Sequence, residues 1–202
     1  MSNRISQDRL AKALHDALTW SEFVDRMQVN KDRIEENFRA HQLTASDRAV
    51  LSRLPCRLTV LALVHDWCGD VAANLPILAR FEEAGYIKLA ILEKNPHNTD
   101  LGLLYPHRSG EVHIPIYIAY DDQLQEQGHF IERSARLDAL MASWTEEFWQ
   151  KNSQLTRAAE FSQLEESTKT QLLLWLNNRR NEVRDQERSD MAAWLSEGSF
   201  KK

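Results

Sequence analysis

The sequence predicts an α/β fold in which a central mixed sheet is flanked by helices and extended by further helices at both ends of the chain. Residues 58–64 form an unbroken apolar or β-branched run, which is typical of a strand buried on both faces of a sheet. From residue 71 the apolar positions recur at helical spacing, and residues 87–92 form a second strand-like run. The order strand, helix, strand predicts two parallel neighbouring strands joined by a helical crossover.

Before the central strand, residues 6–54 are predicted to form several short helices. Thr19 is followed by Glu22 with the spacing of a capping box, and Thr44 begins a similar pattern. We expect residues 1–55 to form an N-terminal helical extension that packs on the core. A surface for a partner protein is the alternative for this region.

Beyond the second strand, residues 95–105 are predicted to hold a loop and a short helix, and Ser109-Gly110 a turn. The runs 114–120 and 127–131 flank a polar segment and predict an antiparallel hairpin, which makes the sheet mixed. A helix over 133–150 is expected to close a domain that spans residues 56–150. Its apolar stripe, which we interpret as core, consists of Leu137, Leu140, Met141, Trp144 and Phe148.

Residues 151–202 are predicted to form a C-terminal helical extension of amphipathic character. This extension either covers the domain or pairs with a second copy in a homodimer, and the sequence leaves both possibilities open. The positions expected to be buried in it are Leu164, Leu172, Leu173, Leu176, Trp194 and Leu195.

Composition narrows the classes of function. The chain has 202 residues and a formal net charge of −5, so it offers no general surface for nucleic acid or anionic membrane. Its N-terminal segment lacks an apolar run of signal-peptide length, and no apolar run is long enough to cross a bilayer. Two cysteines without a secretion signal indicate reduced thiols. We therefore expect a cytoplasmic protein.

Cys68 is the best candidate for a reactive residue, because it lies where the central strand ends and the following helix begins. The free amides of a helix N-terminus favour a thiolate over a thiol. Asp70 in the same turn opposes this effect through its charge, although it also suits the helix dipole. His65 and His113 are expected near the sulfur, where either a structural role or stabilisation of the thiolate is open.

The segment Trp67-Cys68-Gly69-Asp70, between a buried strand and a helix, resembles the active-site turn of the thioredoxin superfamily. Pro76 lies eight residues after the cysteine, where thioredoxins carry a helix-kinking proline, and Ile114-Pro115 resembles the cis-proline loop of the family. The resemblance extends from about Leu58 to His129. A dithiol motif needs a second cysteine where this chain has Val71. In this respect the chain is similar to a bacterial branch of thioredoxin-like proteins in which WCGD precedes a small apolar residue.

The resemblance implies a thioredoxin-like fold and thiol-disulfide chemistry by a single cysteine. Cys68 would be the nucleophile, and Trp67 would shield one side of the turn. For Asp70, a catalytic role and a structural role as a cap of the helix are both open. A cis peptide bond before Pro115 is implied in the same way. The residues implied to contact the substrate are Gly69, His113, Ile114 and Pro115.

Cys56 is not expected to resolve a disulfide at Cys68. The intervening strand separates the two by about 20 Å, at about 3.3 Å per residue, whereas a disulfide needs Cα atoms within about 7 Å. The expected chemistry is monothiol exchange with a protein disulfide or a glutathione adduct, cleared by an external thiol. The alternative is a non-catalytic interaction module. Neither a phosphate-binding glycine motif nor a closely spaced zinc-ligand set is present in the sequence, so we expect no cofactor and no metal.

Overall fold

The computed structural model describes residues 4–197. Contacts between residues divide the chain into two compact units. The first ends at Glu132 and resumes at Arg188, and the second runs from Arg133 to Glu187. The first unit thus combines the expected N-terminal extension with most of the expected domain and with the part of the last helix that begins at Arg188.

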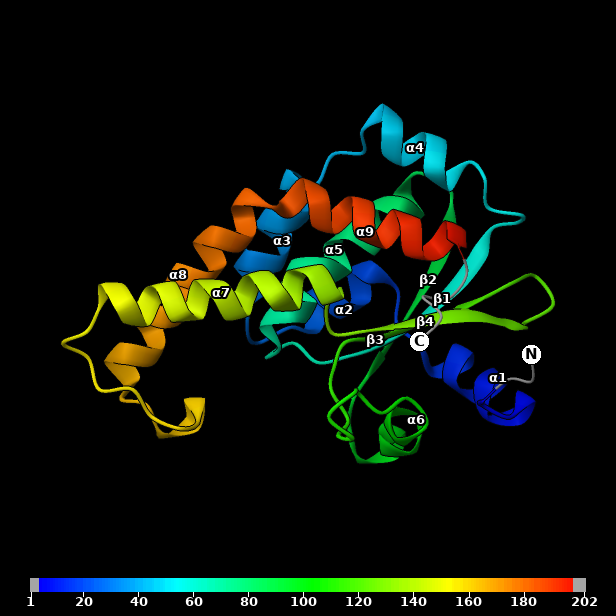
Figure 1. Cartoon of the computed structure of the whole chain (residues 1–202). Helices are drawn as coiled ribbons and strands as arrows, with labels where there is room; N and C mark the ends of the chain where they lie inside the picture. The colour runs from blue at the N-terminus through cyan, green and yellow to red at the C-terminus, as the bar shows by residue number, and fades with distance from the viewer. Residues whose placement is uncertain (1–3, 198–202) are drawn as a thin grey trace. The chain divides into compact units, whose positions relative to one another are not determined.

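The first unit is built on a mixed four-stranded sheet with the order β2-β1-β3-β4 (Figure 1). β1 pairs with β2 in parallel, and β3 pairs antiparallel with both β1 and β4. The predicted crossover and the predicted hairpin are therefore both confirmed. The strands are β1 (Leu58–Val64), β2 (Ile87–Glu93), β3 (Ile116–Tyr120) and β4 (Glu126–Ile131).

Two short helices of this unit begin at the predicted capping signals, and the helix predicted after β1 is present. Capping boxes at Thr19 and Thr44 are confirmed. Each threonine side chain accepts the backbone N–H of the third helical residue, and the carboxylate of that residue accepts the backbone N–H of the threonine. The helix after Thr44 ends at Leu51. The helices are α1 (Gln7–Asp16), α2 (Trp20–Arg26), α3 (Lys31–Ala40), α4 (Ala45–Leu51), α5 (Gly69–Glu83), the 3-10 turn η1 (Pro96–Asn98), α6 (Thr99–Leu103) and α9 (Arg184–Glu197).

Helices cover both faces of the sheet because alternate side chains of each strand point to opposite sides (Figure 1). Val60 and Ala62 belong to a core shared with α2 to α5 and with the C-terminal part of α9. Leu61 and Leu63 belong to a second core shared with α1 and α6. The unit is therefore a three-layer α/β/α structure, and it carries the turn from β1 into α5.

Within the first unit, a buried ion pair connects the last helix to α4. Arg188 Nε lies 2.7 Å from Asp47 Oδ2, and both side chains are almost fully buried. Ser189 Oγ donates to the other oxygen of the same carboxylate. The pair connects α9 to α4, which lie far apart in the sequence.

The second unit has its own small core. It contains α7 (Ala135–Lys151), the 3-10 turn η2 (Phe161–Gln163) and α8 (Glu166–Glu182). The apolar contacts centre on Phe148 and Leu172, and Trp175 Nε1 donates to the backbone oxygen of Trp144 at 2.9 Å. The prediction for Leu173 is wrong, since its exposed fraction is 47%. It follows Leu172 by one residue and so points about 100° away around the helix.

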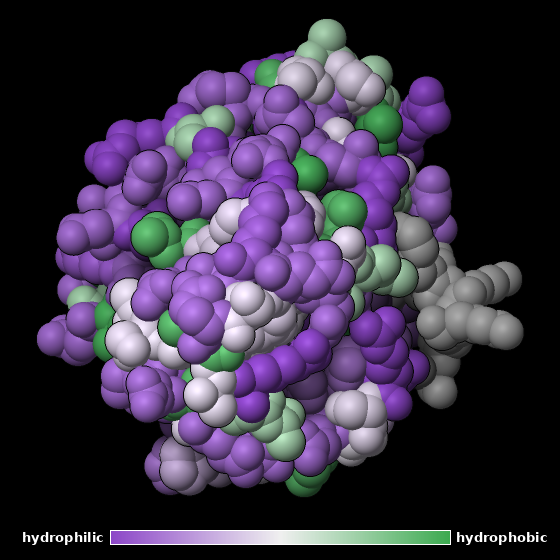
Figure 2. Space-filling model, turned by 60° about the vertical axis from the view of Figure 1, so that its left-hand side comes forward, coloured by the Kyte–Doolittle hydropathy of each residue, from purple (hydrophilic) through white to green (hydrophobic). Residues whose placement is uncertain are grey.

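Hydrophilic residues predominate on the face of the molecule drawn in Figure 2, and apolar side chains form small scattered groups there. Among the helices of residues 4–197, none combines the length and the apolar character that crossing a membrane requires.

Candidate active site

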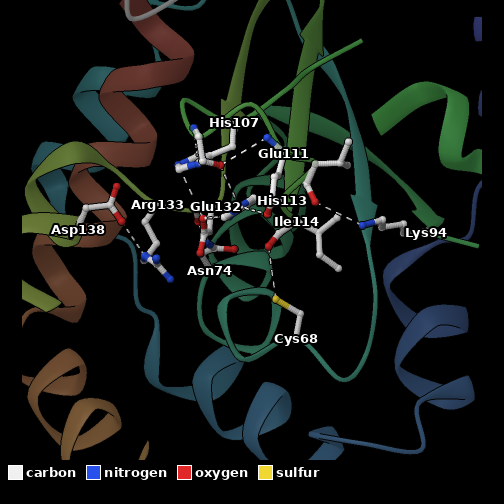
Figure 3. A network of polar contacts seen from close by, with 12 residues as sticks. Cys68, Asn74, Lys94, His107, Glu111, His113, Ile114, Glu132, Arg133 and Asp138 are labelled. Carbon is white, nitrogen blue, oxygen red and sulfur yellow. Dashed lines mark hydrogen bonds and ion pairs between the residues drawn. The ribbon is translucent and has the colours of Figure 1, made fainter. Parts of the chain in front are cut away.

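Cys68 is the N-terminal cap residue of α5, at the end of the turn that follows β1. Its side chain is buried, with an exposed fraction of 7%. The thiol donates to the backbone oxygen of Ile114, with Sγ and O 3.4 Å apart (Figure 3). The turn is anchored by Asp66, whose carboxylate accepts the amides of Gln28 and Val29 at 2.8 and 3.1 Å.

The loop before β3 carries the predicted cis peptide bond between Ile114 and Pro115, which the structure confirms. The carbonyl of Pro115 accepts the backbone N–H of Glu132 at 2.8 Å. The predicted nucleophile and the predicted substrate-binding loop are therefore in direct contact, because the thiol of Cys68 bonds to that loop.

The environment of Cys68 raises the pKa of its thiol. Burial is the main cause, because a charged thiolate loses its hydration in the interior. The amides of Val71 and Asp70 favour the thiolate, whereas the carboxylates of Asp70 and Glu132 oppose it. The expected conflict between helix terminus and Asp70 is thus present, and burial decides it in favour of the neutral thiol.

The other residues predicted for the site have partners other than the sulfur. Trp67 is exposed over 56% of its surface. His65 bonds to Asp66, with Nδ1 and Oδ1 2.9 Å apart, and its ring centre lies 5.3 Å from that of Trp67. Gly69 opens α5, and Asp70 follows it in the first helical turn. His113, on the other side of the site, bonds through Nδ1 to Glu132 Oε2 at 2.6 Å.

Asn74 is a structural residue of the site that the sequence analysis did not single out. It is fully buried in α5, where its Nδ2 donates to the backbone oxygen of Glu132 at 2.9 Å. Its Oδ1 accepts the hydroxyl of Tyr117 in β3. The amide thus joins α5, β3 and the residue after β4. The sequence indicates this role only by the presence of a single polar residue within an apolar helical run, because a buried amide needs hydrogen-bond partners.

A group of titratable side chains beside the cis-proline loop was also missed. His107, His113 and Glu132 each place one possible ligand atom within 4.8 Å of the others (Figure 3). The two imidazole rings are stacked, with centres 4.2 Å apart. The histidines flank the Ser109-Gly110 turn, and the hairpin brings Glu132 to the same end of the sheet. The sequence shows the turn and the hairpin separately, but only their packing brings the three together.

The family model described as "Thioredoxin" matches residues 17–148, which is more than half of the chain. The chain belongs to the thioredoxin family. The predicted thioredoxin-like α/β fold is therefore confirmed by its family as well as by its sheet, whereas the lone-cysteine branch of the family stays a prediction. No curated protein sequence matches the chain significantly.

Two solved structures share the thioredoxin-like fold of this chain. A Pseudomonas aeruginosa protein described as being of unknown function is 20% identical, with a TM-score of 0.55, and the match covers 72% of this chain and 90% of that one. An HIV epitope scaffold is 22% identical, with a TM-score of 0.54, and the match covers 63% of this chain and 79% of that one. At these identities the likeness concerns the fold alone.

Proposed function

We propose that this thioredoxin-family protein carries out monothiol exchange through Cys68, with protein disulfides or glutathione mixed disulfides of the cytoplasm. The contact between Cys68 Sγ and the carbonyl of Ile114 is the observation that carries the proposal. It places the thiol against the loop on which an extended thiol-bearing peptide would lie. The sulfur is therefore adjacent to any disulfide held on that loop.

In the proposed exchange, the Cys68 thiol loses its proton to solvent and the thiolate attacks one sulfur of the substrate disulfide. A new S–S bond to Cys68 forms, the substrate S–S bond breaks, and the second substrate sulfur leaves as a thiolate that takes up a proton. An external thiol such as glutathione then attacks the mixed disulfide and releases Cys68. Each step exchanges one disulfide for another.

The substrate-binding role is proposed for the residues around the sulfur. Ile114 and Pro115 supply the backbone edge, with Gly69 and His113 on either side. Trp67, which is largely exposed, supplies apolar surface for a docked peptide. Asp70 acts on the sulfur through its charge, which adds to the larger effect of burial in raising the pKa of the thiol.

Two features predict that a mixed disulfide at Cys68 is long-lived. Val71 stands where a second cysteine would release it, and both cysteines of the chain are free. A thiol of raised pKa is also a poor leaving group. We therefore expect no thioredoxin-like reduction of insulin; steady turnover that survives Cys56→Ser would contradict this expectation.

A non-catalytic interaction module is the second candidate function. The buried sulfur and its raised pKa favour it, because a neutral thiol bonded to Ile114 stabilises the turn without any chemistry. In that case the exposed Trp67 and the loop beside it bind a partner, and Cys68 contributes only to the shape of the surface.

Mass spectrometry of the Cys56→Ser protein after incubation with oxidised glutathione distinguishes the two functions. Exchange predicts a glutathione adduct on Cys68 that reduced glutathione removes, and the same treatment of the Cys56→Ser/Cys68→Ser protein gives none. Absence of an adduct in the folded protein, both with oxidised glutathione and with a small peptide disulfide, would favour the interaction module.

A further inference from the structure

We propose that His107, His113 and Glu132 form a binding site for a divalent transition-metal ion, with Zn²⁺ as the ion that fits it best. The proposal does not depend on the thiol chemistry of Cys68, although His113 and Glu132 lie beside the loop to which that thiol bonds. Two imidazole nitrogens and one carboxylate oxygen lie within 4.8 Å of one another. This donor set is typical of zinc sites that keep one coordination position open.

The spacing of the ligand atoms suits coordination. His113 Nδ1 lies 2.6 Å from Glu132 Oε2, and His107 Nε2 lies 3.9 Å from the same oxygen. Tetrahedral zinc with bonds of about 2.0–2.2 Å sets neighbouring ligand atoms about 3.3–3.5 Å apart. The two observed distances lie on either side of this value, so shifts of less than about 1 Å bring the atoms into place.

Ser109 is positioned to orient both imidazoles from behind. Its Oγ lies 3.1 Å from His107 Nδ1 and 3.3 Å from His113 Nε2, the ring nitrogens that do not face Glu132. Metal-bound histidines usually donate from their second nitrogen to an oxygen of this kind. The backbone N–H of Ser109 also donates to His107 Nδ1 at 3.3 Å. Ser109 is exposed, so water can accept this N–H when Nδ1 itself carries a proton.

The carboxylate ligand is held by its own backbone. Glu132 has a left-handed conformation, with a φ of 58°, which is uncommon for a residue with a side chain. Its N–H bonds to the carbonyl of Pro115 and its carbonyl accepts from Asn74. Such a conformation persists where the surroundings hold it, and it occurs often at functional sites.

The loop that carries the two histidines is also fixed. The N–H of His107 bonds to the carbonyl of Glu111 at 2.8 Å, and Gly110 supplies the positive φ of 86° that the reversal requires. Val112, in the same loop, packs so closely on Gly102 of α6 that a Cβ there would lie 2.6 Å from its Cγ1. A fixed loop lowers the cost of bringing two ligands to one ion.

Zinc binding by the full-length, chelator-treated protein tests this proposal, measured by competition with a chromogenic zinc chelator. We expect one zinc ion per chain, and a loss of affinity of at least about tenfold in each of His107→Ala, His113→Ala and Glu132→Gln. His15→Ala serves as the matched control, because the His15 side chain is 88% exposed in α1. Cys68→Ser is expected to bind zinc as the parent protein does.

Cobalt substitution gives a second readout. We expect visible d–d absorption without sulfur-to-cobalt charge transfer, because the proposed site contains no thiolate. Each variant is first checked by circular dichroism, and the three ligand variants keep the test valid if one of them fails to fold. The proposal is overturned by failure of the parent protein to bind zinc, by full affinity in two folded ligand variants, or by loss of binding in Cys68→Ser. None of these results decides whether Cys68 of the parent protein forms a glutathione adduct, so the two proposals can fail separately.

Discussion

At Cys68 two opposing influences act on one sulfur atom. The helix terminus offers amides to a thiolate, whereas burial and the neighbouring carboxylates favour the neutral thiol and prevail. A thiol that reacts slowly at neutral pH is consistent with exchange only when a substrate disulfide is held against it. The proposed exchange therefore depends more on the Ile114-Pro115 loop than on an activated nucleophile.

The rate of iodoacetamide alkylation against pH, in the Cys56→Ser protein, measures this balance. We expect a midpoint above the model thiol value of about 8.5, because burial raises the pKa of Cys68. Asp70→Asn is expected to lower the midpoint, because it removes a nearby negative charge. Asp122→Asn, in the turn at the other end of the hairpin, is the matched control. A midpoint below 8.5 in the parent protein would contradict the assigned environment.

Among the elements, α5 and β3 are joined by a buried polar contact. The hydroxyl of Tyr117 donates to Asn74, whose amide also holds the backbone of Glu132. A buried polar group that loses its partner has a large desolvation cost. The contact therefore connects the helix that begins after Cys68 to the strand that follows the Ile114-Pro115 loop.

Tyr117→Phe should lower the free energy of unfolding by about 1–3 kcal/mol, because it leaves the Asn74 oxygen buried without its donor. Urea unfolding followed by circular dichroism measures the change. Tyr86→Phe, at a half-buried position, should change stability by less than about 0.5 kcal/mol. Equal effects of the two substitutions would rule out a special role for the contact.

The contact between α6 and the histidine loop yields a further prediction. Gly102→Ala should destabilise by about 1–3 kcal/mol, because the new methyl group would overlap Val112 Cγ1, and this outweighs the better helix propensity of alanine. The measurement is again urea unfolding. In the double variant Gly102→Ala/Val112→Ala the overlap is removed, so the loss should be smaller than the sum of the single effects; simple additivity would contradict the assigned overlap.

Across the whole molecule, the ion pair of Asp47 and Arg188 joins positions 141 residues apart. Burial alone would raise the pKa of Asp47, but hydrogen bonds from Thr44 and the charge of Arg188 lower it. The pair therefore stabilises the fold above the pKa of an unfolded aspartate, about 3.9. That contribution is lost as the pH falls through the lower pKa of the folded state.

Arg188→Met should destabilise the protein by about 3–5 kcal/mol at neutral pH, because Asp47 keeps a buried charge without its partner. The difference from the parent should shrink as the pH falls below about 3.9, where Asp47 of the unfolded chain is protonated. Urea unfolding at several pH values checks both expectations. Lys169→Met removes one partner of a surface ion pair with Glu166 and should cost less than about 1 kcal/mol.

Local patterns in the sequence were sufficient to predict the elements of the sheet. The apolar run 58–64, the change to helical spacing after Gly69, and the two capping boxes depend on neighbouring residues, and the structure confirms them. The position of Cys68 at the start of a helix follows from the same local signals. The β1–β2 and β3–β4 pairs join strands that follow one another in the chain, as predicted, whereas the β1–β3 pair joins distant segments and was not predicted.

The order of strands and helices along the chain, the resemblance to thioredoxins and the place of the lone cysteine all follow from local patterns in the sequence. Tertiary structure alone decided the state of the sulfur, since burial by distant segments raises its pKa. It also decided the partners of Asn74, Asp47 and the His107, His113 and Glu132 group. These contacts join residues from separate elements. A local sequence pattern cannot predict them, because the partner of each side chain is set by the packing of distant segments.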